Sequence, residues 1–279
     1  SSTLGSRVSA VVVLICPLLD RFWICMAQVA ESSSSDAPLK GSGKCDVINY
    51  EIHGHDMQLV EVELDPQERV LGEAGAMCFL EDDLEFATKF HDGSDPDAGF
   101  FGRMAQAGKR ALSGGTLALT HFKNKGAVKR KVAFAAPYPG KVLALNLADL
   151  GGEVLCQRGS FLCAAMGTHI SIGYSGSLRT GLFGGAGFIL QKLEGDGLVF
   201  VHAGGTLIER ELLAGGKLRV DTGCIVGFTT TVKFDIQRAG NLKTMLFGGE
   251  GLFLATLEGP GKVWIQSMPF SRLAQRIAA

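Results

Sequence analysis

The chain has 279 residues, of which 46% are hydrophobic, with a formal net charge of −1 and a pI near 6.6. The hydrophobic share is enough for a substantial core, and the balanced charge excludes any argument from global charge for binding nucleic acid or an anionic membrane. Glycine, at 38 residues, has about twice its usual share of roughly 7%, whereas proline is scarce at 8. This composition indicates many tight turns in a β-rich fold and excludes a disordered chain.

Seven cysteines are spread along the chain, and no two of them form a C-x-x-C pair. This spacing and the odd count disfavour a zinc ribbon or a redox dithiol. We interpret the cysteines as free thiols in a reducing compartment, several of them buried in strands.

Residues 1–45 are expected to form a leader that is disordered or serves targeting. Val8–Leu19 is an apolar run that is too short to span a bilayer. It suits a signal-like segment or a transit peptide, and Met26 would suit the start of the natural protein; the residues leave these three readings open. Residues 31–44 have the composition of a flexible linker, so the folded part should begin near Cys45.

The most informative feature is an internal repeat with an offset of 64 residues. Between Leu182 and Val199, eleven of eighteen positions recur unchanged between Leu246 and Val263. A more diverged copy lies upstream, around Gly54 and Gly75. A repeat at a fixed offset indicates one supersecondary unit copied in tandem.

Three copies divide the chain after its leader. The ranges are 46–138 for the first β repeat, with an insertion at 91–109, then 139–202 for the second, 203–268 for the third, and 269–279 for a C-terminal tail. The copies are joined by segments of turn length only, which favours one continuous body over three separate beads.

Within each copy the residue pattern is typical of strands. Gln58–Leu64 and Lys217–Val220 alternate between apolar and polar residues. The glycine-rich segments lead into apolar strands and lack the G-x-G-x-x-G spacing of a phosphate loop, so we expect structural turns. The glycines assigned to these turns are Gly184, Gly185, Gly195, Gly197, Gly248, Gly249, Gly259 and Gly261.

One helix is expected, at Phe100–Leu112 in the insertion, because Phe101, Met104 and Leu112 lie on or near one helical face. The predicted fold is therefore all-β. It consists of three tandem curled β-sandwich units, or short double-stranded β-helix units, with one short helix in the first.

His53 and His55 form an H-x-H sequence, with Glu61 and Glu63 following. On a strand, both imidazole rings would point to one face, as a metal site requires. No distant motif completes a ligand set, and a polar strand start near a turn is the alternative interpretation.

A basic hairpin surrounds Gly126, and His121 and Phe122 lie beside it. Three copies in a trimer would present a ring of positive charge to nucleic acid or anionic lipid headgroups, whereas a solvated hairpin is the structural alternative. The basic residues are Lys123, Lys125, Lys129, Arg130 and Lys131. No nucleophile elbow or other local catalytic signature is found, and no cofactor is expected.

Three longer segments carry a resemblance to a known family. They are Arg238–Ser267, Glu73–Met77 and Ala135–Gly140, which contain A-G-N-L-K, L-F-G-G-E-G, L-E-G-P-G-K-V-W-I-Q-S, E-A-G-A-M and A-A-P-Y-P-G. Together they resemble the mitochondrial biogenesis family called altered inheritance of mitochondria protein 24, which includes many bacterial proteins of unknown function. The resemblance covers about residues 46 to 270.

The resemblance implies a fold like that of the tryptophan RNA-binding attenuation protein, with three tandem β units per chain. It also implies a homotrimer in which nine units close a ring. Closure would leave no open sheet edge. The family offers no agreed catalytic residues. Its fungal members are linked to mitochondrial inner-membrane organisation, whereas this chain resembles the compact bacterial type.

Three functions follow as hypotheses. The first is a non-enzymatic β-ring scaffold for mitochondrial or membrane organisation, located in mitochondria by resemblance or else in the cytoplasm, with itself and membranes or proteins as partners. The second is a ring that binds RNA or a small ligand through the basic hairpin. The third is a metal-dependent cupin-like enzyme using His53 and His55.

Overall fold

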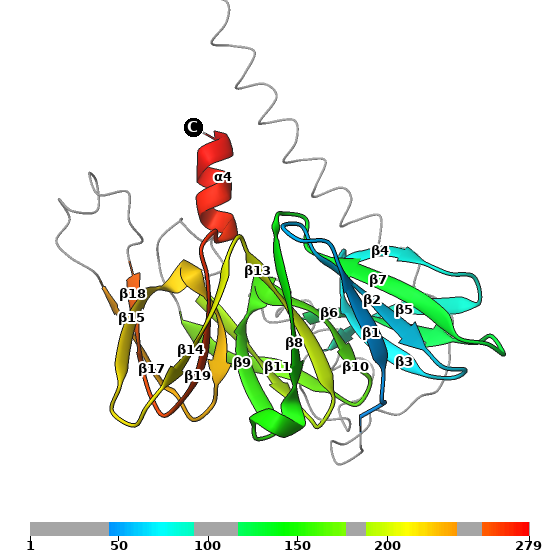
Figure 1. The fold of residues 1–279 in the computed structure, drawn as a ribbon, viewed down its shortest axis with the longest axis horizontal. Coiled ribbons are helices and arrows are strands. Elements are labelled where there is room, and N and C mark those ends of the chain that lie inside the picture. Colours follow the sequence, from blue (N-terminus) through cyan, green and yellow to red (C-terminus); the bar gives the residue numbers. More distant parts are fainter. Residues whose placement is uncertain (1–44, 92–116, 177–187, 239–252, 279) are drawn as a thin grey trace, which may run out of the picture. The chain divides into compact units, whose positions relative to one another are not determined.

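The computed structural model describes residues 45–91, 117–176, 188–238 and 253–278, all within the second of two compact units, Pro38–Ala279 (Figure 1). The helix expected at Phe100–Leu112 lies outside the described residues, as do Gly184, Gly185, Gly248 and Gly249. The predicted all-β class is confirmed, because strands make up most of the described residues.

Nineteen strands are described, which fall into three successive groups of seven, six and six. The first group is β1 (Asn49–His53), β2 (Leu59–Leu64), β3 (Arg69–Glu73), β4 (Met77–Leu80), β5 (Leu84–His91), β6 (Leu117–Asn124) and β7 (Arg130–Ala135). The second is β8 (Gly140–Asn146), β9 (Glu153–Gln157), β10 (Phe161–Ala165), β11 (His169–Gly176), β12 (Phe188–Glu194) and β13 (Leu198–Gly204). The third is β14 (Leu207–Leu212), β15 (Lys217–Asp221), β16 (Ile225–Thr229), β17 (Lys233–Arg238), β18 (Phe253–Glu258) and β19 (Gly261–Gln266). We call these groups units 1, 2 and 3.

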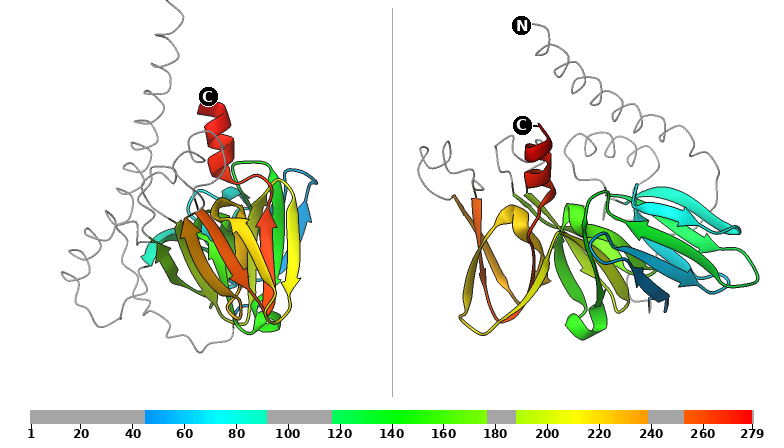
Figure 2. Two further views of the ribbon diagram at one scale, coloured as in Figure 1. Left: turned by 90° about the vertical axis from the view of Figure 1, so that its left-hand side faces the viewer. Right: turned by 45° about the horizontal axis from the view of Figure 1, so that its top comes forward.

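The strands form four sheets whose neighbouring strands pair antiparallel. In strand order the sheets are β1-β2-β7-β4, β5-β6-β3-β10-β13-β8, β11-β12-β9-β16-β19-β14 and β15-β18-β17. The two six-stranded sheets each take three strands from one unit and three from the next (Figures 1 and 2). The units are therefore not separate sandwiches, because their sheets cross the unit boundaries.

The two unit boundaries are joined in the same way. Strand β3 of unit 1 pairs with β10 of unit 2, with Gly72 opposite Cys163. Strand β9 of unit 2 pairs with β16 of unit 3, with Cys156 opposite Gly227. Gly227 follows Cys163 by the 64-residue offset of the repeat, so equivalent residues lie opposite each other at the two joints and the strand register is the same.

Three hydrophobic cores fill the spaces between successive sheets. The first contains Val60, Phe122 and Phe134 of unit 1 together with Phe200 of unit 2. The second and third include Trp264 and Phe228, respectively, both of which are fully buried. Burial of side chains of this size typically contributes about 1.5–3 kcal/mol each. Because each of the three cores takes side chains from at least two units, packing ties the units together as the shared sheets do.

A helix follows the last strand, in the segment that the sequence predicted to be a tail. Helix α4 spans Phe270–Ala278, and Phe270, Leu273, Ala274 and Ile277 share one helical face. It meets unit 3 through Arg272, whose guanidinium lies 2.9 Å from the Asp221 carboxylate. Among the described residues, no helix is both long and apolar enough to cross a bilayer.

Candidate functional site

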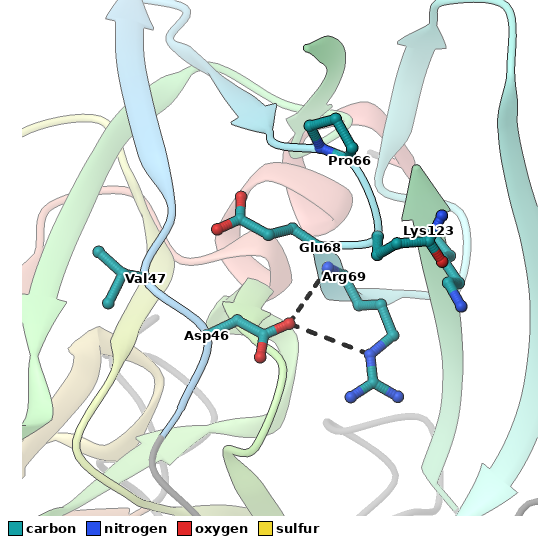
Figure 3. Close-up of a pocket in the computed structure, with 7 residues that line it drawn as sticks. Asp46, Val47, Pro66, Glu68, Arg69 and Lys123 are labelled. Atoms are coloured by element: carbon teal, nitrogen blue, oxygen red, sulfur yellow. Dashed lines mark hydrogen bonds and ion pairs between the residues drawn. The ribbon is translucent and has the colours of Figure 1, made fainter. Parts of the chain in front are cut away.

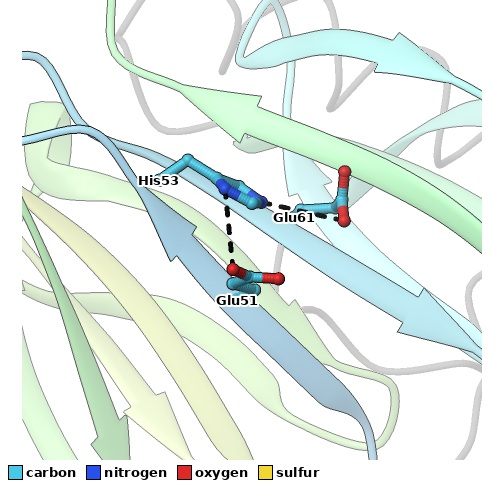
Figure 4. A group of neighbouring side chains, drawn as sticks. All are labelled: Glu51, His53 and Glu61. Carbon is cyan, nitrogen blue, oxygen red and sulfur yellow. Dashed lines mark ion pairs between the residues drawn. The ribbon is translucent and has the colours of Figure 1, made fainter.

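The candidate site on the first sheet is a group of three side chains, Glu51, His53 and Glu61 (Figure 4). Glu51 and His53 lie two residues apart on β1, so they share a face, and β1 pairs with β2 so that Glu51 lies opposite Glu61. His53 Nδ1 lies 3.8 Å from Glu51 Oε1, and His53 Nε2 lies 3.7 Å from Glu61 Oε1. One ligand atom from each residue lies within 4.8 Å of the others, so the group could hold a cation.

His55 does not belong to this group. Strand β1 ends at His53, and Gly54 turns the chain with a φ of +87°. The carbonyl of His55 accepts a hydrogen bond from the Lys141 ammonium. The H-x-H pair therefore does not lie on one strand, and Glu51 takes the place that the sequence analysis gave to His55.

The electrostatics of the group favour an ion pair over a metal. Lys131 Nζ lies 2.6 Å from Glu61 Oε1, and this hydrogen bond lowers the pKa of the Glu61 carboxyl. Lys262 forms the corresponding pair with Glu209 on β19 and β14, at 2.9 Å. Cross-strand pairs of opposite charge are common in sheets. At Glu61 the lysine already occupies the position that a metal would need.

The basic hairpin is largely neutralised by carboxylates on neighbouring strands and in the turn before β5. The ion pairs are Lys125–Glu85 at 3.3 Å, Lys129–Glu63 at 2.7 Å, Arg130–Asp83 at 2.6 Å and Lys131–Glu61 at 2.6 Å. Lys123 lines a surface hollow instead. A binding face for phosphates needs unpaired cations, so this geometry does not favour the nucleic-acid hypothesis.

The hollow has a volume of about 550 Å³ and lies between the start of β1 and the turn before β3 (Figure 3). Asp46 Oδ2 accepts a hydrogen bond of 3.2 Å from the Arg69 backbone N–H and lies 4.0 Å from Arg69 Nε. Asp46 and Arg69 therefore pair with each other, and the remaining lining residues are Val47, Pro66, Gln67, Glu68 and Lys123.

Two buried titratable side chains lie away from the candidate site. Burial raises the pKa of Glu73, on β3, to about 7, and the nearby Arg158 partly opposes this shift. Burial also lowers the pKa of His202, on β13, to about 4. The His202 ring is 1% exposed and meets the Tyr138 ring edge-on, with centroids 4.6 Å apart. Burial thus favours the uncharged form of both Glu73 and His202.

The described cysteines and turn glycines have structural environments. Cys45, Cys78, Cys156, Cys163 and Cys224 are free thiols, and burial raises the pKa of Cys78 and Cys156. Gly195 and Gly197 lie in the turn between β12 and β13, and Gly259 and Gly261 lie at the turn between β18 and β19. Gly261 has a φ of +146°, which favours glycine.

Comparison with known proteins decides the family. Residues 50–268 match the family described as Mitochondrial biogenesis AIM24. The chain belongs to this family. The resemblance found in the sequence is thus confirmed, while the likeness to the tryptophan RNA-binding attenuation protein stays a prediction.

Two bacterial proteins are similar to this AIM24 family chain. An uncharacterised protein of Streptococcus pyogenes serotype M6 is 24% identical over 217 residues, which are 77% of this chain and 84% of the relative. The crystal structure of a Streptococcus pyogenes protein is similar with a TM-score of 0.66 and 22% identity, covering 82% of this chain and 98% of that one. The second likeness shows the shared fold alone.

Two features of the AIM24 family chain were missed by sequence reasoning. Glu51 was not predicted, because it precedes the H-x-H sequence, whereas the predicted carboxylates Glu61 and Glu63 follow it. The second feature is a pair of uncovered sheet edges, β4 and β15, each of which is an end strand in its sheet. The sequence carries no signal for these edges, because the exposure of Met77 and Phe79 is visible only in the structure.

Proposed function

We propose that this AIM24 family chain is a non-enzymatic scaffold protein whose copies join head to tail, β15 of one copy pairing with β4 of the next, into a closed ring. The observation that carries the proposal is that, among the described strands, β4 and β15 are each paired on one side only, whereas the equivalent strands of the other units pair with each other.

A shared irregularity identifies β4 with β10 and β16. Each strand contains a bulge where it pairs with the last strand of its own unit. The bulges fall between Met77 and Phe79, between Phe161 and Cys163, and between Ile225 and Gly227. Because a bulge marks a fixed structural position, the residues that precede the three bulges, Met77, Phe161 and Ile225, are equivalent.

The partner edge is identified in the same way. Strand β9 pairs with β12 so that Gln157 lies opposite Leu190, and β15 pairs with β18 so that Asp221 lies opposite Leu254. Both residues of the second pair follow those of the first by 64 positions. Strand β15 is therefore equivalent to β9. Strand β9 pairs with β16 on its second side, whereas β15 pairs with no described strand on that side.

Exposure supports an interface at these edges. All five residues of β10 and all five of β16 are buried, whereas on β4 Met77 is 37% exposed and Phe79 is 45% exposed. Apolar residues on an uncovered edge strand promote pairing with another chain, and native proteins usually cover such an edge.

The internal joints fix the register of the proposed joint. Because Gly72 lies opposite Cys163 and Cys156 opposite Gly227, Phe79 of one copy should lie opposite Val220 of the next. Leu80 should then lie opposite Arg219. The merged sheet would be β17-β18-β15-β4-β7-β2-β1, which continues the pattern of the six-stranded sheets.

A head-to-tail contact between different surfaces closes into a ring when its rotation allows. The resemblance to the family supports three copies and hence nine units. The family description, Mitochondrial biogenesis AIM24, is in keeping with a role in mitochondrial or membrane organisation, and a relative from Streptococcus pyogenes shows that the family also occurs in a cell without mitochondria.

The test is a pair of engineered cysteines, Leu80→Cys with Arg219→Cys, in a chain whose Cys16, Cys25 and Cys78 are serine. Oxidation should give covalent dimers and a closed trimer, and light scattering of the unchanged chain should give three times its 29.5 kDa mass. The control pair, Leu80→Cys with Lys233→Cys, places the second thiol on β17 at the far edge of the sheet and should not cross-link. A monomeric unchanged chain at micromolar concentration, or equal cross-linking of both pairs, would overturn the proposal.

A further inference from the structure

Strand β14 exposes two side chains on the sheet face that borders the third core. The last strands of the units have equivalent residues Phe134, Val201 and Ile265, which lie opposite Val60, Leu143 and Ile208. The residues two positions further along, which are Val62, Leu145 and Arg210, are therefore equivalent as well. Val62 is fully buried and Leu145 is 6% exposed, but Arg210 is exposed and its neighbour on the same face, Ile208, is 41% exposed. The same face thus loses its cover only in unit 3.

Inside the chain, the next unit supplies that cover. Val62 belongs to the first core together with Val142 and Phe200 of unit 2, and Leu145 belongs to the second core together with Trp264 of unit 3. If the ring forms, the cover over Arg210 comes from the sheet of the next copy that contains β2 and β7.

Equivalence also shows which residues of that sheet face Arg210. Ala133 corresponds to Phe200 and Trp264, because the three stand next to the bulge in their pairs with Phe79, Cys163 and Gly227. Glu61 lies opposite Ala133, as Glu209 lies opposite Trp264. Glu61 lies on the sheet face away from the first core, because Val60 and Val62 face that core.

Resting on the proposed head-to-tail ring, we propose that the Glu51–His53–Glu61 group is the docking site for Arg210 of the neighbouring copy. Among the described residues Arg210 forms no ion pair, and the ion pair of Glu51 is with His53, at 3.8 Å. A guanidinium presents several donors in one plane and can bridge two carboxylates. The two carboxylates of Glu51 and Glu61, together with the ammonium of Lys131, carry a net charge of about −1, which one arginine would neutralise.

The position already tolerates a carboxylate inside the chain. Glu209, the equivalent of Glu61, lies on a sheet face that packs against the second core and accepts a hydrogen bond of 2.9 Å from Trp264 Nε1 as well as the ion pair with Lys262. A glutamate at this joint is therefore satisfied by donors around it. At the joint between copies, Ala133 replaces the tryptophan, and Arg210 supplies the donor that is lost.

The experiment measures assembly by sedimentation velocity over a concentration series. Arg210→Glu and Glu51→Arg should each weaken ring formation about tenfold or more, and the double variant should recover most of the loss, because the pair is restored with its charges exchanged. Lys125→Glu, at an exposed ion pair of the hairpin, serves as the control and should assemble like the unchanged chain.

The outcomes separate this proposal from the ring itself. An unchanged chain that stays monomeric removes the ring and this contact together. An unchanged chain that forms a ring and cross-links at Leu80 and Arg219, while Arg210→Glu assembles normally, overturns only the docking site. Stoichiometric zinc that is retained on the assembled ring and lost in His53→Ala would overturn it too, because the carboxylates would then serve the metal.

Discussion

Cys156 lies directly opposite Gly227 where unit 2 joins unit 3, and Gly72 lies opposite Cys163 where unit 1 joins unit 2. Each joint thus sets a cysteine against a glycine. At the second joint the reason is space, because a Cβ on Gly227 would lie 2.7 Å from the Leu155 carbonyl oxygen and 3.2 Å from the Cys156 Cα. The close approach of β9 and β16 depends on the missing side chain.

Gly227→Ala should therefore destabilise the chain. Backbone atoms at 2.7 Å cannot rotate away, so the two strands must separate, at a cost of about 1–3 kcal/mol. Urea unfolding followed by circular dichroism measures the change. Gly159→Ala is the matched control, since no atom lies within 4 Å of a Cβ placed there. Equal stability of both variants would contradict the packing argument.

Glu73 should make the stability depend on pH between about 4.5 and about 7. Its pKa is raised to about 7 by burial, so the folded chain holds the proton more tightly than the unfolded chain. The free energy of unfolding should fall as pH rises through this range, by about 3 kcal/mol at most, and then level off. Glu73→Gln should abolish this component in urea titrations at a series of pH values, whereas an unchanged slope would contradict the assignment.

His202 should act in the opposite direction. Burial lowers its pKa to about 4 from a usual value of 6.5, so the folded chain resists protonation. Its contribution is fully present above pH 6.5 and is lost as pH falls towards 4, again by about 3 kcal/mol at most. His202→Gln places there the residue that unit 3 has at the equivalent position, Gln266, and should weaken the acid sensitivity. His55→Gln, an exposed histidine, should leave it unchanged.

The basic hairpin should bind RNA weakly at most. Lys129, Arg130 and Lys131 already form ion pairs at 2.6–2.7 Å, so few counterions would be released on binding. Replacing these three residues by alanine should leave the anisotropy of a labelled single-stranded RNA nearly unchanged at low salt. A strong, salt-dependent signal that the triple variant loses would restore the RNA-binding hypothesis.

Much of the fold could be predicted from the repeat. The 64-residue offset matches Phe161 with Ile225 at the start of equivalent strands, and the β pattern within each copy led to the correct fold class. The repeat shows which strands are equivalent but does not show which edges meet. Pairing of β3 with β10 depends on backbone hydrogen bonds between units, which leave no periodic signal in the sequence.

The candidate site was predicted only in part. His53 and Glu61 do come together, because β1 and β2 form an antiparallel pair. Glu51 was missed, since its partner across the pair depends on register. Helix α4 was missed as well, although the spacing of Phe270, Leu273, Ala274 and Ile277 is helical, because nine residues at a chain end look like a tail without their docking partner Asp221.

The two six-stranded sheets each belong to two neighbouring units, and each of the three cores takes side chains from at least two units. No single unit can therefore melt without stripping backbone partners from the next. Heat should produce one cooperative transition for the whole body, where a string of independent modules would show several. A repeat built in this way cannot be excised and reused elsewhere as a free-standing domain.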